Sequence, residues 1–412
     1  MGIEGERPAG GEELSEDNRP RIPASEILAK IEMGEPVKYD GVVIEGDLDI
    51  SKLDLPIENV ERTNEQERIG LTEDVKVVKS SIRITNSDIL STVNFNNSII
   101  RGDADFGETS FYKDADFSRS IFSGNADFSG SIFRGDADFS GSTFDWYANF
   151  YISAFSGNAN FRGSTFSGFA DFSRSKFGCD AYFWGSEFSG NADFSGSTFS
   201  GNAKFDPCSF NGESLDFRGT RFNRLQDQEF PCRRAKQLAQ NLSDKEEADN
   251  YYYREMEGRR VRLQEEEVDE WEISFPIQRT IELDTYANIS LFNAFKYLRY
   301  NLFEAIFVQR IFGYGVRPYQ LAAWWLFAVI TFALAYWGLK GIHLSGDQIT
   351  PDNAAVATFR EYLYFSIVTS ATPGYGGYRP HGVSQWLAGA QAIFGTFMWA
   401  AFITTFARKY MR

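Results

Sequence analysis

A glycine-rich segment near the C-terminal end of the chain combines residue types that bind a cation through oxygen atoms. The segment consists of Thr372, Pro373, Gly374, Tyr375 and Gly376. Backbone carbonyl oxygens, with the Thr372 hydroxyl at the inner end, can replace the water shell of a cation when several copies surround one axis. A single loop of this kind cannot enclose an axis, so the chemistry requires an oligomer.

The neighbouring segments must hold this loop inside a membrane. Tyr319–Leu339 and Val383–Ala407 contain no charged residue and are long enough to cross a bilayer. Between them, Tyr362–Thr372 is mostly apolar or hydroxyl-bearing but too short to cross. Irregular backbone is tolerated at membrane depth where it lines a water-filled path. We therefore predict two spans in a lipid bilayer that enclose a short re-entrant helix and a pore loop.

The spacing around the loop carries a resemblance to a known family. Thr369 lies three residues before Thr372, and Pro380 lies eight residues after it. With these positions the stretch resembles the pore module of tetrameric potassium channels. The resemblance implies that Thr372–Gly376 is the selectivity filter and that four chains close a ring around permeating K⁺. It also implies supporting roles for Thr369, Gly377 and Pro380; no cofactor and no other metal is expected.

Two positions depart from the pattern of that family. Pro373 stands where the family usually has Val or Ile, and Gly377 stands where it usually has Asp. Proline has no N–H to tie the filter to the pore helix, and it disfavours the α region at Thr372. Glycine lacks a carboxylate that would brace the outer mouth. These departures leave open whether the pore selects K⁺, also passes Na⁺, or does not conduct.

The two spans also bear on opening and orientation. Gly395 falls near the point where the family bends its inner helix, so it is a candidate gating hinge; close helix packing is the alternative.

The first span has no series of arginines, which excludes a voltage sensor. Basic residues beside the spans place both termini in the cytoplasm of a multi-pass cell-membrane protein. They are Lys296, Arg299, Arg310, Arg317, Arg408, Lys409 and Arg412.

A second pattern occupies the N-terminal half of the chain. Ala-Asp-Phe or a close variant recurs every eleven residues from Ala104 to Ala203, and a second phenylalanine follows each first one by five residues. A small residue stands two positions before each phenylalanine. This period does not fit a helix face and predicts a solenoid of short strands with both residues inside. The pattern resembles pentapeptide repeats, which implies a right-handed quadrilateral β-helix over about Tyr39–Phe222.

Charge on the repeat region allows two interpretations. Aspartates between the inward positions are expected to form one outward acidic stripe of Asp105, Asp116, Asp127, Asp138, Asp171 and Asp193. The stripe is either a binding face for a cation or a protein, or, as we favour, a solvated surface with turn hydrogen bonds. The chain carries a net charge of −16, and the part before Gly313 carries −20. Such an acidic body argues against nucleic acid as a partner.

The order of these patterns predicts a multidomain protein. Its parts are a disordered acidic tail (1–22), the β-helix with an N-terminal capping helix (23–224), a helical linker (225–290), an interfacial helix (291–317) and an all-α two-span pore domain (318–412). The capping helix is expected over Ser25–Met33 with Ser25 as its N-cap, and Ser243 or Asp244 is expected to cap the second linker helix. Gating force is expected to enter along Leu291–Gly315 into the first span, or laterally by contact between the ends of the inner helices and the cytoplasmic body, with a hinge between Arg260 and Leu291.

We predict a homotetrameric cation channel resembling potassium channels, with a cytoplasmic β-helix in a regulatory or docking role. This leaves open an unidentified cytoplasmic ligand or protein on the β-helix. The alternative is a membrane-anchored pentapeptide-repeat scaffold with a non-conducting pore. A DNA-imitating rod is a third interpretation, for which two spans are a poor platform. Three cysteines without CxxC spacing and two histidines give no nucleophile–base pair or metal cluster, so an enzyme is not expected.

Overall fold

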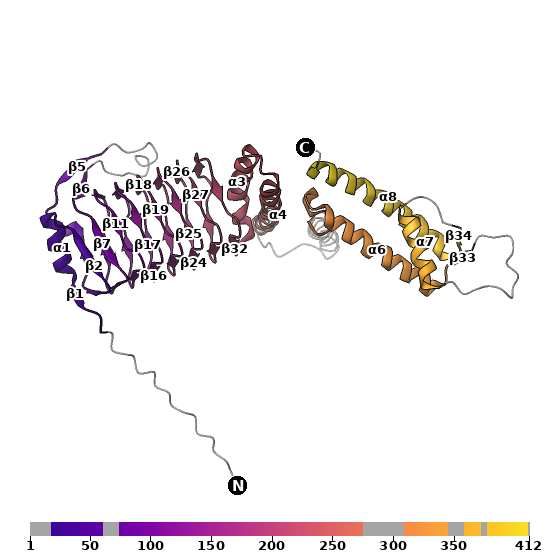
Figure 1. Ribbon diagram of the computed structural model, residues 1–412, viewed down its shortest axis with the longest axis horizontal. Helices are drawn as coiled ribbons and strands as arrows, with labels where there is room; N and C mark the ends of the chain where they lie inside the picture. The colour runs from indigo at the N-terminus through magenta and orange to yellow at the C-terminus, as the bar shows by residue number, and fades with distance from the viewer. Residues whose placement is uncertain (1–17, 61–73, 275–308, 345–357, 372–376, 411–412) are drawn as a thin grey trace, which may run out of the picture. The chain divides into compact units, whose positions relative to one another are not determined.

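The computed structural model describes residues 18–60, 74–274, 309–344, 358–371 and 377–410 (Figure 1). The chain divides into two compact units, Met1–Leu238 and Ala239–Arg412. Three predicted features lie outside the described residues: the acidic tail up to residue 17, most of the interfacial helix, and the filter segment 372–376. The predicted end of the tail at residue 22 is wrong, because Arg21 and Ile22 pair with Val43 and Ile44 in the solenoid.

The first unit is a β-helix with four faces, as the repeat pattern predicted. One coil contains the strands β11 (Ala104–Asp105), β12 (Ser110–Phe111), β13 (Ala115–Asp116) and β14 (Ile121–Phe122), one on each of faces 1 to 4. Successive coils pair in parallel, and Ala104 lies opposite Ala126, which is 22 residues further along. The stacked strands are seen side by side in Figure 1.

Each face is one sheet, and its remaining strands are as follows. Face 1 has β2 (Val37–Asp40), β7 (Ile82–Thr85), β15 (Ala126–Asp127), β19 (Ala148–Asn149), β23 (Ala170–Asp171), β27 (Ala192–Asp193) and β31 (Leu215–Asp216). Face 2 has β1 (Arg21–Pro23), β3 (Val43–Glu45), β8 (Asp88–Ile89), β16 (Ile132–Phe133), β20 (Ala154–Phe155), β24 (Lys176–Phe177), β28 (Thr198–Phe199) and β32 (Arg221–Phe222). Face 3 has β4 (Leu48–Asp49), β9 (Val93–Asn94), β17 (Ala137–Asp138), β21 (Ala159–Asn160), β25 (Ala181–Tyr182) and β29 (Ala203–Lys204). Face 4 has β5 (Ile57–Asn59), β6 (Asp74–Val78), β10 (Ser98–Ile100), β18 (Thr143–Phe144), β22 (Thr165–Phe166), β26 (Glu187–Phe188) and β30 (Ser209–Phe210).

Stacked phenylalanines fill the interior of the solenoid. Phe150 is fully buried and stacks on Phe172 of the next coil, with ring centroids 4.8 Å apart and planes 1° apart. Most of the small inward residues also have a hydrogen-bond partner in the core, because their hydroxyl groups donate to a phenylalanine carbonyl of the preceding coil. Ser131, for example, donates to the Phe106 carbonyl at 2.7 Å, and the Cys208 thiol donates to the Phe183 carbonyl in the same way. Burial of each ring contributes about 1.5–3 kcal/mol, so the coils form a stiff unit.

The predicted single acidic stripe is wrong. Asp105 pairs with Asp127 on face 1, whereas Asp116 pairs with Asp138 on face 3. Because eleven residues are half of a 22-residue coil, alternate repeats fall on opposite faces. Each of the six aspartates accepts a hydrogen bond from the backbone N–H two residues later, at 2.7–3.1 Å. These hydrogen bonds confirm the role in the turns, and a binding face on either side of the solenoid is not tested by them.

Helices close both ends of the solenoid. The N-terminal helix α1 (Ala24–Met33) begins after Pro23, and the expected N-cap at Ser25 is wrong because Ser25 lies inside the first turn. At the other end, η2 (Leu225–Gln228) and α3 (Glu229–Asn241) follow the last coil. The side chain of Arg234 on α3 donates to the Phe210 carbonyl at 2.7 Å, so the helix caps an edge of the last strands. The short helix η1 (Ile50–Lys52) lies in the first coils.

The second unit contains the predicted spans and the helix between them. Its elements are α4 (Lys245–Ser274), η4 (Gly313–Gly315), α6 (Pro318–Leu339), β33 (Ile342–Leu344), α7 (Phe359–Ala371), β34 (Tyr378–Pro380) and α8 (Val383–Tyr410). Asp244 caps α4 through a hydrogen bond from the Glu247 N–H, which confirms one of the two expected caps. The helices α6 and α8 are the two that are long and apolar enough to cross a membrane among the described residues. Both contact α7 (Figure 1).

Candidate ion pathway

The N-terminal end of the helix α7 is held by a carboxylate. Glu361 accepts hydrogen bonds from the Thr358 N–H and from the Thr358 hydroxyl, as in a capping box. The donation from the Thr358 N–H lowers the pKa of Glu361. The Tyr378 hydroxyl donates to the same carboxylate at 3.3 Å, which ties the helix to the segment after the filter. The Thr-x-x-Glu spacing is readable in the sequence, but we did not predict this contact.

The middle of α7 packs between the two spans. A buried apolar cluster joins the three helices and the short hairpin, and it consists of Tyr336, Ile342, Tyr362, Phe365 and Ala388. The rings of Tyr336 and Phe365 meet edge to face with centroids 5.0 Å apart. Within its own chain, α7 is therefore packed against both α6 and α8.

The residues predicted to support the filter have distinct surroundings. Thr369 on α7 is 2% exposed, and its hydroxyl has no hydrogen-bond partner among the described residues. Pro380 pairs with Ile342 in the β33–β34 hairpin, which ties the segment after the filter to the end of α6. Gly377 has a φ of +85°, a conformation that L side chains rarely adopt. This backbone conformation is a physical reason for glycine at a position where the family usually has aspartate.

Close packing surrounds Gly395 on α8. A β-carbon at this position would lie 2.2 Å from the carbonyl oxygen of Ser370, near the C-terminal end of α7. The inner helix therefore approaches the backbone of the pore helix at a glycine, as the packing alternative requires. A bend at Gly395 during opening stays a prediction.

The described residues hold no cluster of three or more His, Cys, Asp or Glu side chains placed to bind a metal ion. The predicted filter segment, residues 372–376, lies outside the described residues. Thr369 and Pro380 lie on either side of that segment along the chain.

The outer faces of α6 and α8 expose large apolar side chains. They are Leu326, Phe327, Ile330, Leu334, Trp337, Trp386, Ile393, Phe397 and Ile403. Exposed apolar surface of this extent requires cover by lipid or by other chains. Both helices thus have the surface of membrane spans, in agreement with their sequence.

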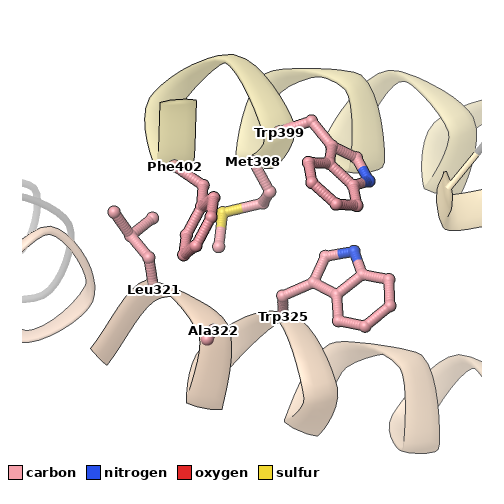
Figure 2. A pocket seen from close by; sticks show the side chains of 6 residues that line it. All are labelled: Leu321, Ala322, Trp325, Met398, Trp399 and Phe402. Carbon is pink, nitrogen blue, oxygen red and sulfur yellow. The ribbon is translucent and has the colours of Figure 1, made fainter. Parts of the chain in front are cut away.

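A cavity of about 220 Å³ lies between α6 and α8 (Figure 2). Its lining is almost wholly apolar and consists of Leu321, Ala322, Trp325, Met398, Trp399 and Phe402. The indole N–H of Trp325 has no hydrogen-bond partner within the part of the chain that the structure describes. The cavity therefore offers apolar contacts. This cavity could not be predicted from the sequence, because it depends on how the two helices face each other.

The helix α4 contacts the segment that leads into the first span. The Gln309 side chain donates to Glu257 of α4 at 2.8 Å. The Arg317 guanidinium lies 3.8 Å from the centroid of the Tyr253 ring, and Tyr314 packs edge-on against the same ring. The helix α4 is continuous up to Ser274, so the predicted hinge is wrong for residues 260–274. The rest of that hinge region, which includes Pro276, lies outside the described residues.

A short buried helix between two apolar helices, followed by a glycine-rich segment, defines the pore domain of a membrane channel. Residues 321–412 match the family model described as "Ion channel". Residues 117–156, 150–196 and 183–225 match the model described as "Pentapeptide repeats (9 copies)". The chain thus joins pentapeptide repeats to an ion channel domain of the two-transmembrane potassium-channel kind. No curated protein and no solved structure matches the chain.

Proposed function

We propose that the chain forms a homotetrameric cation channel of the cell membrane that conducts K⁺. The observation that carries the proposal is the position of α7, which is enclosed by α6 and α8 and ends directly before Thr372–Gly376. One pore loop per chain requires several chains around an axis, and four is the number in the family that the loop resembles. Carbonyl oxygens of Thr372, Pro373, Gly374 and Tyr375 would then replace the hydration of the ion.

Ion flux through reconstituted protein tests this function. The purified full chain in liposomes is expected to carry K⁺ down a gradient. The variant Gly374→Val, which adds a bulky side chain at a glycine of the filter segment, is expected to carry none. The largest species after cross-linking in detergent should contain four chains, whereas a largest species of two or three chains would contradict the proposal. A fourfold assembly without flux would favour the membrane-anchored scaffold. Inhibition of a type II topoisomerase would instead favour the DNA-imitating interpretation.

We also propose that the β-helix and both termini are cytoplasmic. The support is the set of basic residues beside the spans, which includes Arg310, Arg317 and Arg408. Cys179 provides a natural reporter because it is an exposed free cysteine on the solenoid, whereas Cys232 is buried. A membrane-impermeant thiol reagent should label Cys179 only after cells are permeabilised. Labelling in intact cells would reverse the orientation, and Cys179→Ser provides the control.

The proposed role of the β-helix is regulation or docking of the pore. Support comes from the contacts of α4 with Gln309, Tyr314 and Arg317, which connect the helix after the solenoid to the start of the first span. The stacked core makes the solenoid stiff, so a ligand or protein bound to it would move it as one body. Such a movement would reach α6 through the α4 contacts.

A further inference from the structure

Four polar side chains form a hydrogen-bond network inside the pore domain and connect its three helices. Tyr336 lies on α6, Ser366 and Ser370 lie on α7, and Gln391 lies on α8. The Tyr336 hydroxyl donates to Gln391 Oε1 at 2.7 Å. Gln391 Nε2 lies 2.6 Å from Ser366 Oγ and 2.6 Å from Ser370 Oγ. All four residues are at least 96% buried.

The partners of Gln391 fix the orientation of its amide. The Ser366 hydroxyl donates to the Val329 carbonyl at 2.7 Å, so Ser366 Oγ is left as an acceptor for the glutamine NH₂. The other side of the amide faces the Tyr336 hydroxyl, which donates to it. A glutamate would place an acceptor against the serine oxygens, and an apolar residue would remove the acceptor of the Tyr336 hydroxyl and the donor to both serine oxygens. Both changes are unfavourable at a buried site.

The network acts on the part of α7 that leads into the filter. Ser370 is the second-last residue of the helix and lies two residues before Thr372, and Ser366 lies one turn earlier. Apolar contacts between helices tolerate small rotations, whereas hydrogen bonds fix direction. The network therefore holds the rotation and depth of the last turn of α7 from the side of the inner helix. In this chain neither Pro373, without an N–H, nor Gly377, without a side chain, can supply such support.

We propose that Gln391 is a positioning residue that sets ion selectivity by holding the last turn of the pore helix, and that Tyr336 orients it. This inference rests on the proposed channel function. Gln391 does not touch the ion; it acts through Ser366 and Ser370. Loss of the amide allows the last turn of α7 to rotate, which changes the spacing of the carbonyl oxygens that begin at Thr372.

Reversal potentials under K⁺ on one side and Na⁺ on the other test the proposal in the reconstituted full chain. Gln391→Met keeps the length of the side chain and removes the amide. It is expected to change the K⁺/Na⁺ permeability ratio about three- to tenfold, which corresponds to part of the free energy of the three side-chain hydrogen bonds that are lost. Tyr336→Phe should cause a smaller change in the same direction. The matched control Gln385→Met, at an exposed position of α8, should cause none.

An unchanged permeability ratio in a folded and conducting Gln391→Met channel would overturn the proposal. Hydrogen exchange of the α7 amides in solubilised protein gives a readout that does not need conduction. Gln391→Met should speed exchange at Ser370 about tenfold, and Gln385→Met should not. Equal exchange in both variants would overturn the positioning role, whereas absence of flux from the wild type would overturn only the proposed function. If Gln391→Met fails to assemble, Tyr336→Phe, which removes one hydroxyl, takes its place in both experiments.

Discussion

The variant Gly395→Ala separates close packing from flexibility as the reason for glycine on α8. The added β-carbon would lie 2.2 Å from the Ser370 carbonyl oxygen, and ordinary contact begins at 3.4 Å, so the two helices must separate by about 1.2 Å along this direction. Overpacking of this kind costs about 1–3 kcal/mol. Alanine gains only about 0.5–1 kcal/mol over glycine in a helix. We therefore expect a net loss of stability and a shift of the last turn of the pore helix.

The measurements are the thermal midpoint of the solubilised oligomer and the single-channel conductance. Gly389→Ala on the same helix is the matched control, because its β-carbon would have no neighbour within 4 Å among the described residues. Gly395→Ala should lower the midpoint and change the conductance, and Gly389→Ala should do neither. A Gly395→Ala channel with native midpoint and conductance but altered open probability would refute the packing argument and favour a hinge.

Four further predictions follow from other parts of the chain. Phe150→Ala should destabilise the solenoid by about 3–5 kcal/mol in urea unfolding followed by circular dichroism, and the half-exposed Phe169 gives a control whose replacement by alanine costs much less. Arg317→Gln removes the cation from the Tyr253 ring of α4, a contact worth about 1 kcal/mol. It should therefore change the open-to-closed ratio roughly fivefold and leave the conductance unchanged. Altered conductance with unaltered gating would contradict the role of α4. Because the pKa of Glu361 is lowered, the stability that this carboxylate contributes is present above the ordinary glutamate pKa and is lost as the pH falls through the lowered value. The thermal midpoint of Glu361→Gln should therefore depend less on acid pH than that of the wild type, and identical acid profiles would exclude this carboxylate. Pro373→Val restores an N–H in the filter segment and should raise the K⁺/Na⁺ permeability ratio, whereas an unchanged reversal potential would show that proline does not set selectivity.

The sequence predicted the solenoid because its signal is local and repeated. Every coil needs a large apolar residue and a small residue at fixed positions, and Phe150 and Ser131 illustrate the two types in the structure. The separation of the aspartates onto two faces was not predicted, although a four-sided coil holds two eleven-residue repeats and therefore places alternate aspartates on opposite faces. The N-cap of α1 was also misplaced, because the tertiary fold lets the helix begin after Pro23 without a side-chain cap.

The candidate site was predictable in its order and only partly in its contacts. The two spans and the helix between them follow from length and polarity. The partners of Gln391 do not, because a polar residue inside a span indicates only that some partner exists. Its partners depend on the rotation of three helices about their axes. The sequence does not encode this rotation, because the spans are apolar on all sides. The contact of Gly395 with Ser370 depends on the same rotation.

The length of the coil sets a rule for how this protein can lengthen or shorten during evolution. Loss of 22 residues removes one whole coil, shortens the solenoid by a strand spacing of about 4.8 Å, and leaves each later strand on its face. Loss of 11 residues preserves the stacking of phenylalanines equally well but moves each later strand to the opposite face. Recombination between adjacent repeats can produce both outcomes. Odd changes in repeat number therefore turn every downstream surface by half a revolution about the solenoid axis, whereas even changes alter only the length.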